Sequence, residues 1–244
     1  MSAVQEKVCL IIPCYNEEER LDFSRFKSYG FIHYLFVNDG STDATLQRLQ
    51  ENVTEPDYYL DLSANCGKAE AVRKGILYAR KLPIWEEITW VGFWDADLAT
   101  PVEEVEFFLR FIEITGKGAD AIYGSRVDRL GGAISRDYLR HLLGRVFATV
   151  VQLVLNTGSY DSQCGAKLFK KSVVEEAFAE PFISRWLFDI EILLRLRNRR
   201  IVECPLRQWS EIRGSKIRFF SFTARALRDI WLIRLRYGRK TSAS

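Results

Sequence analysis

Short apolar runs recur along the first half of the chain, separated by polar stretches and by segments with apolar residues at helical spacing. We predict strands at residues 8–12, 31–37, 58–62, 88–94 and 119–123. The segment after the third strand carries Ala71, Val72, Ile76 and Ala79 on one helical stripe. Strand, loop and helix alternate with a period of about 30 residues, as βαβ units do. The pattern therefore predicts an α/β fold with a mostly parallel central sheet.

The pattern is less regular in the second half. It predicts a helix from about Leu139, a short strand after the polar turn at 161–165, a helix near Asp189 and a strand at 201–205. Between Ile217 and Tyr237, apolar residues recur at helical spacing and arginines occupy much of the remainder. We expect one domain over residues 1–216, followed by a basic amphipathic helix and tail over residues 217–244. This helix can lie on an anionic membrane surface, or dock on its own domain with a solvated basic face.

Two carboxylates, Asp95 and Asp97, follow the apolar run that ends at Trp94. Alternate residues of an extended chain point the same way, so both side chains are expected to present oxygens to one point. Open α/β sheets bind ligands at the carboxyl ends of their strands. Such oxygen ligands suit Mg²⁺ or Mn²⁺ on a diphosphate. The alternative is a turn whose aspartates cap the next helix.

Further polar residues follow other predicted strands, on the same edge of the sheet. Glu17 and Asp39 can hold a base and a ribose by hydrogen bonds, with Lys68 close to a phosphate. Individually, each acid can instead be one that favours a helix N-terminus, worth about 0.3–1 kcal/mol. Ser41 or Thr42 is the expected N-cap of the helix that follows Asp39.

Composition narrows the class of protein. With 244 residues, 48% of them hydrophobic, the chain can bury the core of one α/β domain. With only two histidines in the sequence, a histidine-based metal site or a Ser-His-Asp triad is not expected. The five cysteines have no metal-ligand spacing, and we expect reduced thiols in a cytoplasmic protein. No apolar run approaches the about 18–20 residues that a membrane-spanning helix needs.

The charge is unevenly distributed. The net charge of +3 is small, but basic residues crowd the chain after Arg185. This asymmetry points to a phosphate-rich or membrane-surface partner. The aromatic residues are not interleaved with the basic tail as base stacking requires, so no nucleic-acid partner is expected. The sequence gives no indication of the oligomeric state.

Several motifs together carry a family resemblance. The first half contains Pro13-x-Tyr15-Asn16-Glu17, Val37-Asn38-Asp39-Gly40-Ser41-x-Asp43, Asn65-x-Gly67-Lys68, Asp95-Ala96-Asp97 and Gly124-Ser125-Arg126. These motifs resemble those of family 2 glycosyltransferases, which have the GT-A fold. The second half contains Asp161-x-Gln163-Cys164-Gly165-x-Lys167-Leu168-Phe169, Trp186-x-Phe188-Asp189-x-Glu191 and Gly214-Ser215-Lys216. These are similar to the dolichyl-phosphate β-glucosyltransferase branch, which is related to dolichyl-phosphate mannose synthases.

The resemblance, which covers residues 8–236, also implies roles for particular residues. It implies a nucleotide-sugar site formed by Pro13, Tyr15, Glu17, Asp39, Lys68, Asp95, Ala96, Asp97, Arg213 and Lys216. Asp95 and Asp97 match the metal ligands, and Arg126, Arg136 and Arg140 fall where cationic residues meet an acceptor phosphate. Asn38 and Cys66 depart from the family pattern, which leaves the nucleotide open. The N-terminal membrane helix usual in eukaryotic members is not seen in this sequence.

The expected reaction depends on the acceptor. A phosphate monoester has its second pKa near ~6, so it is largely ionised at neutral pH and can attack directly, with inversion. A sugar hydroxyl needs a base, for which Asp189 or Glu191 is the candidate. Both acids can equally be helix N-terminal residues that pair with nearby arginines.

We expect a metal-dependent inverting transferase that moves a hexose, glucose from UDP-glucose, onto a polyprenyl monophosphate. It would act while bound peripherally to the cytoplasmic face of a membrane, with Asp95, Asp97, Arg126 and Asp189 as its catalytic residues. The alternatives are a GDP-mannose-dependent enzyme, a transferase that acts on a sugar hydroxyl, and a catalytically silent nucleotide-sugar-binding subunit.

Overall fold

The computed structural model describes residues 6–116, 118–127, 133–135, 138–210 and 219–238. For residues 138–143, 146–147 and 219–224, it describes the backbone alone. The strands are β1 Val8–Cys14, β2 Ile32–Asp39, β3 Tyr58–Leu62, β4 Trp90–Trp94, β5 Ala121–Ser125, β6 Ala133–Ser135, β7 Ala166–Lys170, β8 Ile201–Pro205 and β9 Gln208–Ser210. The α-helices are α1 Thr45–Asn52, α2 Lys68–Ala79, α3 Glu104–Thr115, α4 Tyr138–Leu155, α5 Val174–Phe178, α6 Phe188–Arg195 and α7 Phe219–Tyr237. Short 3₁₀ turns span Phe23–Arg25, Pro83–Glu86 and Lys171–Val173.

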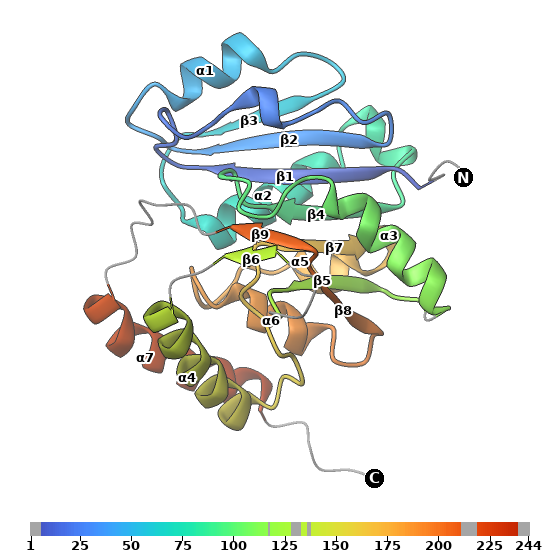
Figure 1. Cartoon of the computed structure of the whole chain (residues 1–244). Helices are drawn as coiled ribbons and strands as arrows, with labels where there is room; N and C mark the ends of the chain where they lie inside the picture. Colours follow the sequence, from blue (N-terminus) through green and yellow to red (C-terminus); the bar gives the residue numbers. More distant parts are fainter. Residues whose placement is uncertain (1–5, 117, 128–132, 136–137, 211–218, 239–244) are drawn as a thin grey trace.

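The chain is built around a seven-stranded sheet of order β3-β2-β1-β4-β7-β5-β8 (Figure 1). The pairs β1–β2, β1–β4, β2–β3 and β5–β8 are parallel, as the alternation of strands and helices predicted. Strand β7 runs antiparallel to both of its neighbours, β4 and β5. A second, two-stranded parallel sheet joins β6 to β9. The α/β fold with a mostly parallel sheet is confirmed.

Each face of the large sheet has its own apolar layer. On one face, Leu10 and Trp94 pack with Val105 and Phe108 of α3. On the other face, the stripe predicted on α2 packs against the sheet, and Phe188 of α6 joins the same cluster. Strand β4 is buried along its whole length, as expected of a central strand covered on both sides.

A third apolar cluster fixes the C-terminal helix. Ile230 and Ile233 of α7 pack with Val151 of α4 and with Leu187 and Ile190 at the start of α6. Helices α4 and α7 lie side by side at the lower left of Figure 1. The inner face of α7 is therefore docked on its own domain.

One local expectation, the N-cap of the helix after Asp39, was wrong. Helix α1 begins at Thr45, and neither Ser41 nor Thr42 caps it. Instead the Asp43 carboxylate accepts hydrogen bonds from the amide and hydroxyl of Thr45 at 3.0 and 2.5 Å. Ser41 accepts a bond from the amide of Asn16, so its hydroxyl joins the β1 and β2 loops rather than capping a helix.

Candidate functional site

The acidic pair lies at the carboxyl end of β4, in a turn rather than in extended chain. The amide of Leu98 donates to the carbonyl of Asp95 at 3.1 Å, and Asp97 accepts the amide of Ala99 at 3.0 Å. The extended geometry expected for Asp95 and Asp97 is therefore wrong, because the strand ends at Trp94. Burial and the negative charge of Asp95 raise the pKa of Asp97. The two carboxylates are thus close enough to repel each other, a situation that a cation relieves.

Strand β7 closes one side of the acidic pair. A Cβ atom built on Gly165, the residue before β7, would lie 1.8 Å from Oδ2 of Asp95. No side chain fits there, so the backbone of residue 165 lies directly against this carboxylate. The glycine quoted in the family motif has a steric function at this point.

Lys68 is the first residue of α2 and reaches the acidic pair. Its ammonium forms an ion pair with Oδ1 of Asp95. Burial acts to lower the pKa of Lys68, but the carboxylates of Asp95 and Asp189 outweigh it and raise that pKa. A helix N-terminus with a lysine is a favourable position for phosphate groups.

A second ion pair lies behind the first. Lys167 of β7 is fully buried, and its Nζ lies 2.7 Å from Oδ1 of Asp189 on α6. The ammonium also lies 5.2 and 4.9 Å from the ring centroids of Phe93 and Tyr123. Burial raises the pKa of Asp189, although Lys167 and Lys68 act in the opposite direction. Acidic and basic groups therefore alternate from the acidic pair into the protein core.

Sequence reasoning gave Lys167 no role, although it quoted the residue within a motif. The available signal was a lysine inside an apolar strand, flanked by Ala166 and Leu168. A lysine is almost never fully buried without a partner.

Asp39 orders the loop that precedes Lys68. The residue is 2% exposed, and its carboxylate accepts the amides of Cys66 and Gly67, both at 2.7 Å. It also accepts the side-chain amide of Asn65 at 3.1 Å. Burial, opposed by these bonds, raises the pKa of Asp39. Direct contact between Asp39 and a nucleotide stays a prediction.

The residues around β1 lie at the same edge of the sheet. Pro13 belongs to β1, and Tyr15 in the following loop is 41% exposed. The amide of Glu17 donates to the Thr45 hydroxyl at 2.8 Å, and its carboxylate pairs with Arg20. Ala96, between the two aspartates, is buried. Their contacts with a nucleotide sugar remain predictions.

Arg126, directly after β5, is held by a partner that the sequence did not reveal. Its Nε and one terminal nitrogen donate to the Asp161 carboxylate at 2.8 and 2.7 Å, and its amide donates at 2.9 Å. Glu203 in turn accepts the amides of Tyr160 and Asp161 at 2.8 and 3.1 Å, which fixes this loop. Burial would lower the pKa of Arg126, but Asp161 outweighs it and raises that pKa. A permanently charged, oriented guanidinium is suited to a phosphate.

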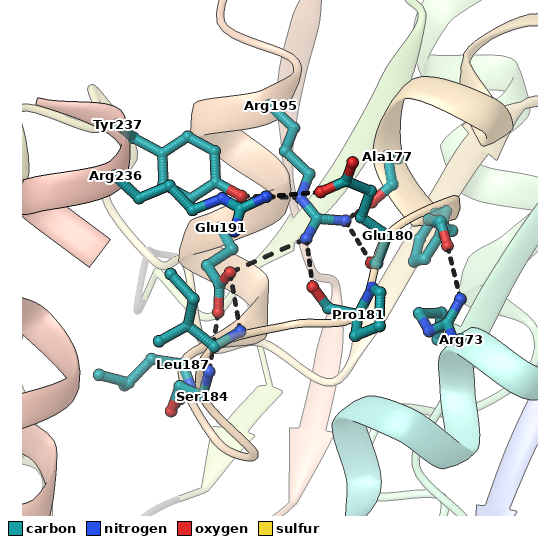
Figure 2. Close-up of polar contacts among 12 residues, drawn as sticks. Arg73, Ala177, Glu180, Pro181, Ser184, Leu187, Glu191, Arg195, Arg236 and Tyr237 are labelled. Atoms are coloured by element: carbon teal, nitrogen blue, oxygen red, sulfur yellow. Dashed lines mark hydrogen bonds and ion pairs between the residues drawn. The ribbon is translucent and has the colours of Figure 1, made fainter. Parts of the chain in front are cut away.

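The structure separates the roles of the two acids on α6. Glu191 is fully buried and accepts the amides of Ser184 and Ile183 at 2.9 and 3.1 Å (Figure 2). Burial raises its pKa against these bonds. The candidate role of Glu191 as a base is wrong, because its oxygens bind backbone amides and Oε2 lies 3.9 Å from Arg195, the arginine pairing given as the alternative. Asp189 faces the charged cluster instead.

Four predicted site residues cannot be placed as side chains. Arg136, Arg213 and Lys216 lie outside the described residues, and Arg140 is described only as part of the α4 backbone. Their roles stay predictions.

In the described ranges, no three His, Cys, Asp or Glu side chains gather in a group that could hold a metal ion. Asp95 and Asp97 would therefore supply two protein ligands, with a diphosphate and water completing the shell, as Mg²⁺ commonly requires. Hard carboxylate oxygens, one of them already attracting the Lys68 ammonium, fit such a cation.

An acidic pair and a lysine-bearing helix N-terminus at the carboxyl edge of this sheet place the chain in the GT-A class of nucleotide-sugar transferases. Residues 9–178 match the family model described as glycosyl transferase family 2, and the chain belongs to this family of enzymes.

Known relatives agree with this assignment. A dolichyl-phosphate beta-glucosyltransferase from Drosophila melanogaster is 31% identical, over 95% of this chain and 75% of the relative. The human protein of that name is 29% identical, over 95% of this chain and 76% of the relative.

Solved structures share the fold at low sequence identity. Glucosyl-3-phosphoglycerate synthase from Mycobacterium tuberculosis, in complex with phosphoglyceric acid, has a TM-score of 0.66 at 17% identity, over 97% of this chain and 82% of that one. The same synthase in complex with Mn²⁺, uridine-diphosphate and glucosyl-3-phosphoglycerate has a TM-score of 0.64 at 16% identity, with the same coverage.

Proposed function

We propose that the chain transfers glucose from UDP-glucose to dolichyl phosphate or a similar polyprenyl monophosphate, with inversion, with the help of Mg²⁺ or Mn²⁺. The observation that carries the proposal is the pair Asp95 and Asp97 beside Lys68. This site lies in a chain 31% identical to a dolichyl-phosphate beta-glucosyltransferase. The solved synthase in complex with Mn²⁺ and uridine-diphosphate supports the choice of metal and nucleotide.

The donor would bind at the carboxyl edge of the sheet. Lys68 and the N-terminus of α2 attract the diphosphate, and Asp95 and Asp97 would hold the cation. When bound, the cation would neutralise negative charge on the departing nucleoside diphosphate. Lys68 contributes to the same stabilisation from its fixed position at the helix end.

The state of Asp189 favours a phosphate acceptor over a hydroxyl acceptor. A general base must reach the proton that it removes, but Asp189 is 5% exposed and paired with Lys167 at 2.7 Å. A phosphate monoester carries its own nucleophilic oxyanion and needs no base. Arg126, oriented by Asp161, would bind that phosphate.

The outer face of α7 is suited to a membrane surface. Leu227, Trp231 and Leu235 succeed one another at helical spacing and are 56%, 59% and 47% exposed. Val150 and Leu153 of the adjacent α4 are also exposed, and Arg225 and Arg228 lie on the exposed surface of α7. We call Val150, Leu153, Leu227, Trp231 and Leu235 the α4–α7 face. Exposed apolar residues beside arginines favour binding to anionic lipid, on the cytoplasmic side where a sugar nucleotide is available.

None of the helices that the structure describes is long and apolar enough to cross a bilayer. The exposed apolar residues of the α4–α7 face and the arginines beside them lead us to propose peripheral binding through it. The double variant Leu227→Ser/Trp231→Ser is expected to lose flotation with anionic vesicles. The control Ile114→Ser, which removes an 82% exposed apolar residue on the distant α3, is expected to float as the wild type does. Equal flotation of the double variant and the wild type would refute the membrane role.

The activity is tested by incubating the protein with labelled UDP-glucose, UDP-galactose or GDP-mannose, a short polyprenyl phosphate and Mn²⁺. The wild type is expected to transfer glucose from UDP-glucose, and Asp97→Ala is expected to lose this activity. Transfer from GDP-mannose alone would show that GDP-mannose, and not UDP-glucose, is the donor. Full activity of Asp97→Ala with unchanged metal dependence would show that the acidic pair is structural. Binding without any transfer would indicate a silent subunit.

A further inference from the structure

The segment at residues 183–187, between α5 and α6, is in contact with α7. Ser184 is 1% exposed, and its hydroxyl donates to the Asp229 carboxylate of α7 at 2.6 Å. The same hydroxyl oxygen accepts the amide of Leu187 at 3.0 Å. Asp229 therefore fixes the direction of a hydroxyl that accepts the amide of Leu187, in the turn leading into α6.

Glu191 holds the same serine from inside α6. Its carboxylate accepts the amide of Ser184 at 2.9 Å, as Figure 2 shows. The hydroxyl of Ser184 accepts the amide of Leu187 and its own amide donates to Glu191, so both ends of this turn are held by side chains. Asp189 lies in the first turn of this helix, so its position depends on how Ser184 is held.

The segment also reaches the donor side of the site. Arg185 donates from Nε to the carbonyl of Cys66 at 2.9 Å and from a terminal nitrogen to Oδ1 of Asn65 at 2.8 Å. A Cβ atom on Gly67 would lie 2.5 Å from Nε of Arg185, and the backbone φ of Gly67 is +87°. Arg185 thus packs against the residue that precedes Lys68.

Two polar contacts lie at the C-terminal end of α7, away from Ser184. Arg236 pairs with Glu180, and Nε of Arg195 donates to the Tyr237 hydroxyl at 3.1 Å (Figure 2). These contacts fasten the C-terminal end of α7 to the chain before residue 181 and to the last turn of α6. They hold the helix without a hydrogen bond to Ser184, although Arg195 lies 3.9 Å from the Glu191 carboxylate.

We propose that Asp229 is a positioning residue for the transfer reaction. Through Ser184 it sets the start of α6 and the adjacent Arg185, and so the placement of Asp189 and Lys68. Helix α7 is then part of the donor site's framework as well as the carrier of the α4–α7 face. The inference rests on the proposed function, because that function assigns Lys68 to the donor site.

The test compares Asp229→Ala, Asp229→Asn and Glu180→Ala in the full chain. UDP binding with Mn²⁺ is measured by calorimetry, and kcat and KM for UDP-glucose are measured separately. Asp229→Ala is expected to weaken UDP binding and lower kcat by about tenfold, because small misplacements of reacting groups are costly. Asp229→Asn keeps an oxygen that accepts the hydrogen bond of the Ser184 hydroxyl, so this variant is expected to retain most of the UDP affinity and most of kcat. Glu180→Ala, which frees the other end of α7, is expected to match the wild type.

Unchanged UDP affinity and kcat in Asp229→Ala would overturn the proposal. Equal losses in Asp229→Ala and Glu180→Ala would also overturn it, because they would show a general effect of loosening α7. If Asp229→Ala does not fold, Ser184→Ala is expected to give the same tenfold losses, and wild-type behaviour of that variant overturns the inference. A wild-type protein that binds UDP but glucosylates no lipid phosphate would refute the proposed acceptor, while the UDP-binding comparison still decides the role of Asp229.

Discussion

Replacing Lys167 by methionine is the most informative perturbation of the core. The ammonium of Lys167 is fully buried and pairs with Asp189 at 2.7 Å. Methionine fills a similar volume but leaves the Asp189 carboxylate without its nearest opposite charge. Phe93 and Tyr123, which surround the ammonium, offer no replacement cation.

The expected cost is large compared with the stability of a protein. Removing one partner of a buried ion pair costs about 3–5 kcal/mol, whereas whole domains are stable by about 5–15 kcal/mol. Removing both charges avoids the uncompensated ion. The double variant Lys167→Met/Asp189→Asn should therefore be more stable than the sum of the single losses predicts, by about 1–3 kcal/mol.

The stability lost in Lys167→Met should also depend on pH. Burial raises the pKa of Asp189 above its ordinary value of 3.8, so at pH values between the unfolded and folded pKa the folded state binds more protons than the unfolded state. Stability contributed by that proton is present at low pH and falls as pH rises through the folded pKa. Without Lys167, which opposes this rise, the folded pKa moves higher. The deficit of Lys167→Met should be smaller near about pH 5 than near about pH 8.

Urea unfolding of the wild type, both single variants and the double variant, at both pH values, checks these expectations. A matched control is Lys170→Met, which removes an ammonium on the same strand that is only partly buried. Losses that add within about 0.5 kcal/mol would refute the coupling between Lys167 and Asp189. An Lys167→Met deficit that is the same at both pH values would refute the assignment of the buried charge to Asp189.

Two further predictions concern the site itself. Gly165→Ala should displace the Asp95 carboxylate, since the added Cβ lies 1.8 Å from its Oδ2 atom. Mn²⁺-dependent UDP binding, measured by calorimetry, should weaken by about tenfold or more. Unchanged binding would mean that Asp95 does not hold the cation. Arg126→Lys removes the guanidinium that donates two hydrogen bonds to Asp161. The KM for the lipid phosphate should rise by about tenfold, while UDP binding stays as in the wild type. A rise in the dissociation constant for UDP instead would show that Arg126 acts on the donor.

The strands of the first half were predictable because their apolar runs are local. The predicted ranges 58–62 and 201–205 coincide with β3 and β8, and the strands before and after them are offset by a few residues. The pairing of β6 with β9 was not predictable, because strands of three residues with a partner far along the chain carry no periodic pattern. The antiparallel direction of β7 was likewise invisible, since alternation within a strand does not encode its direction.

The candidate site was predictable to the extent that its residues follow strands. Asp95, Lys68 and Arg126 do so, and their position at one edge of the sheet followed from the strand pattern. Their partners are set by tertiary structure instead. Asp161 and Lys167 are remote in sequence from the groups that they pair with, so only the packing of β5, β7 and α6 brings them together.

The place of β7 in the sheet has a consequence for synthesis on the ribosome. Strands β3, β2, β1 and β4 are complete once residue 94 has emerged, but the next strand in the sheet, β7, begins only at residue 166. Until then the nascent chain carries β4 as an open edge, the kind of surface that invites pairing with other chains. Asp95 is translated early, yet Gly165, which lies against its carboxylate, follows some seventy residues later. A fragment that ends before β7 would carry the acidic motif without the walls that enclose it.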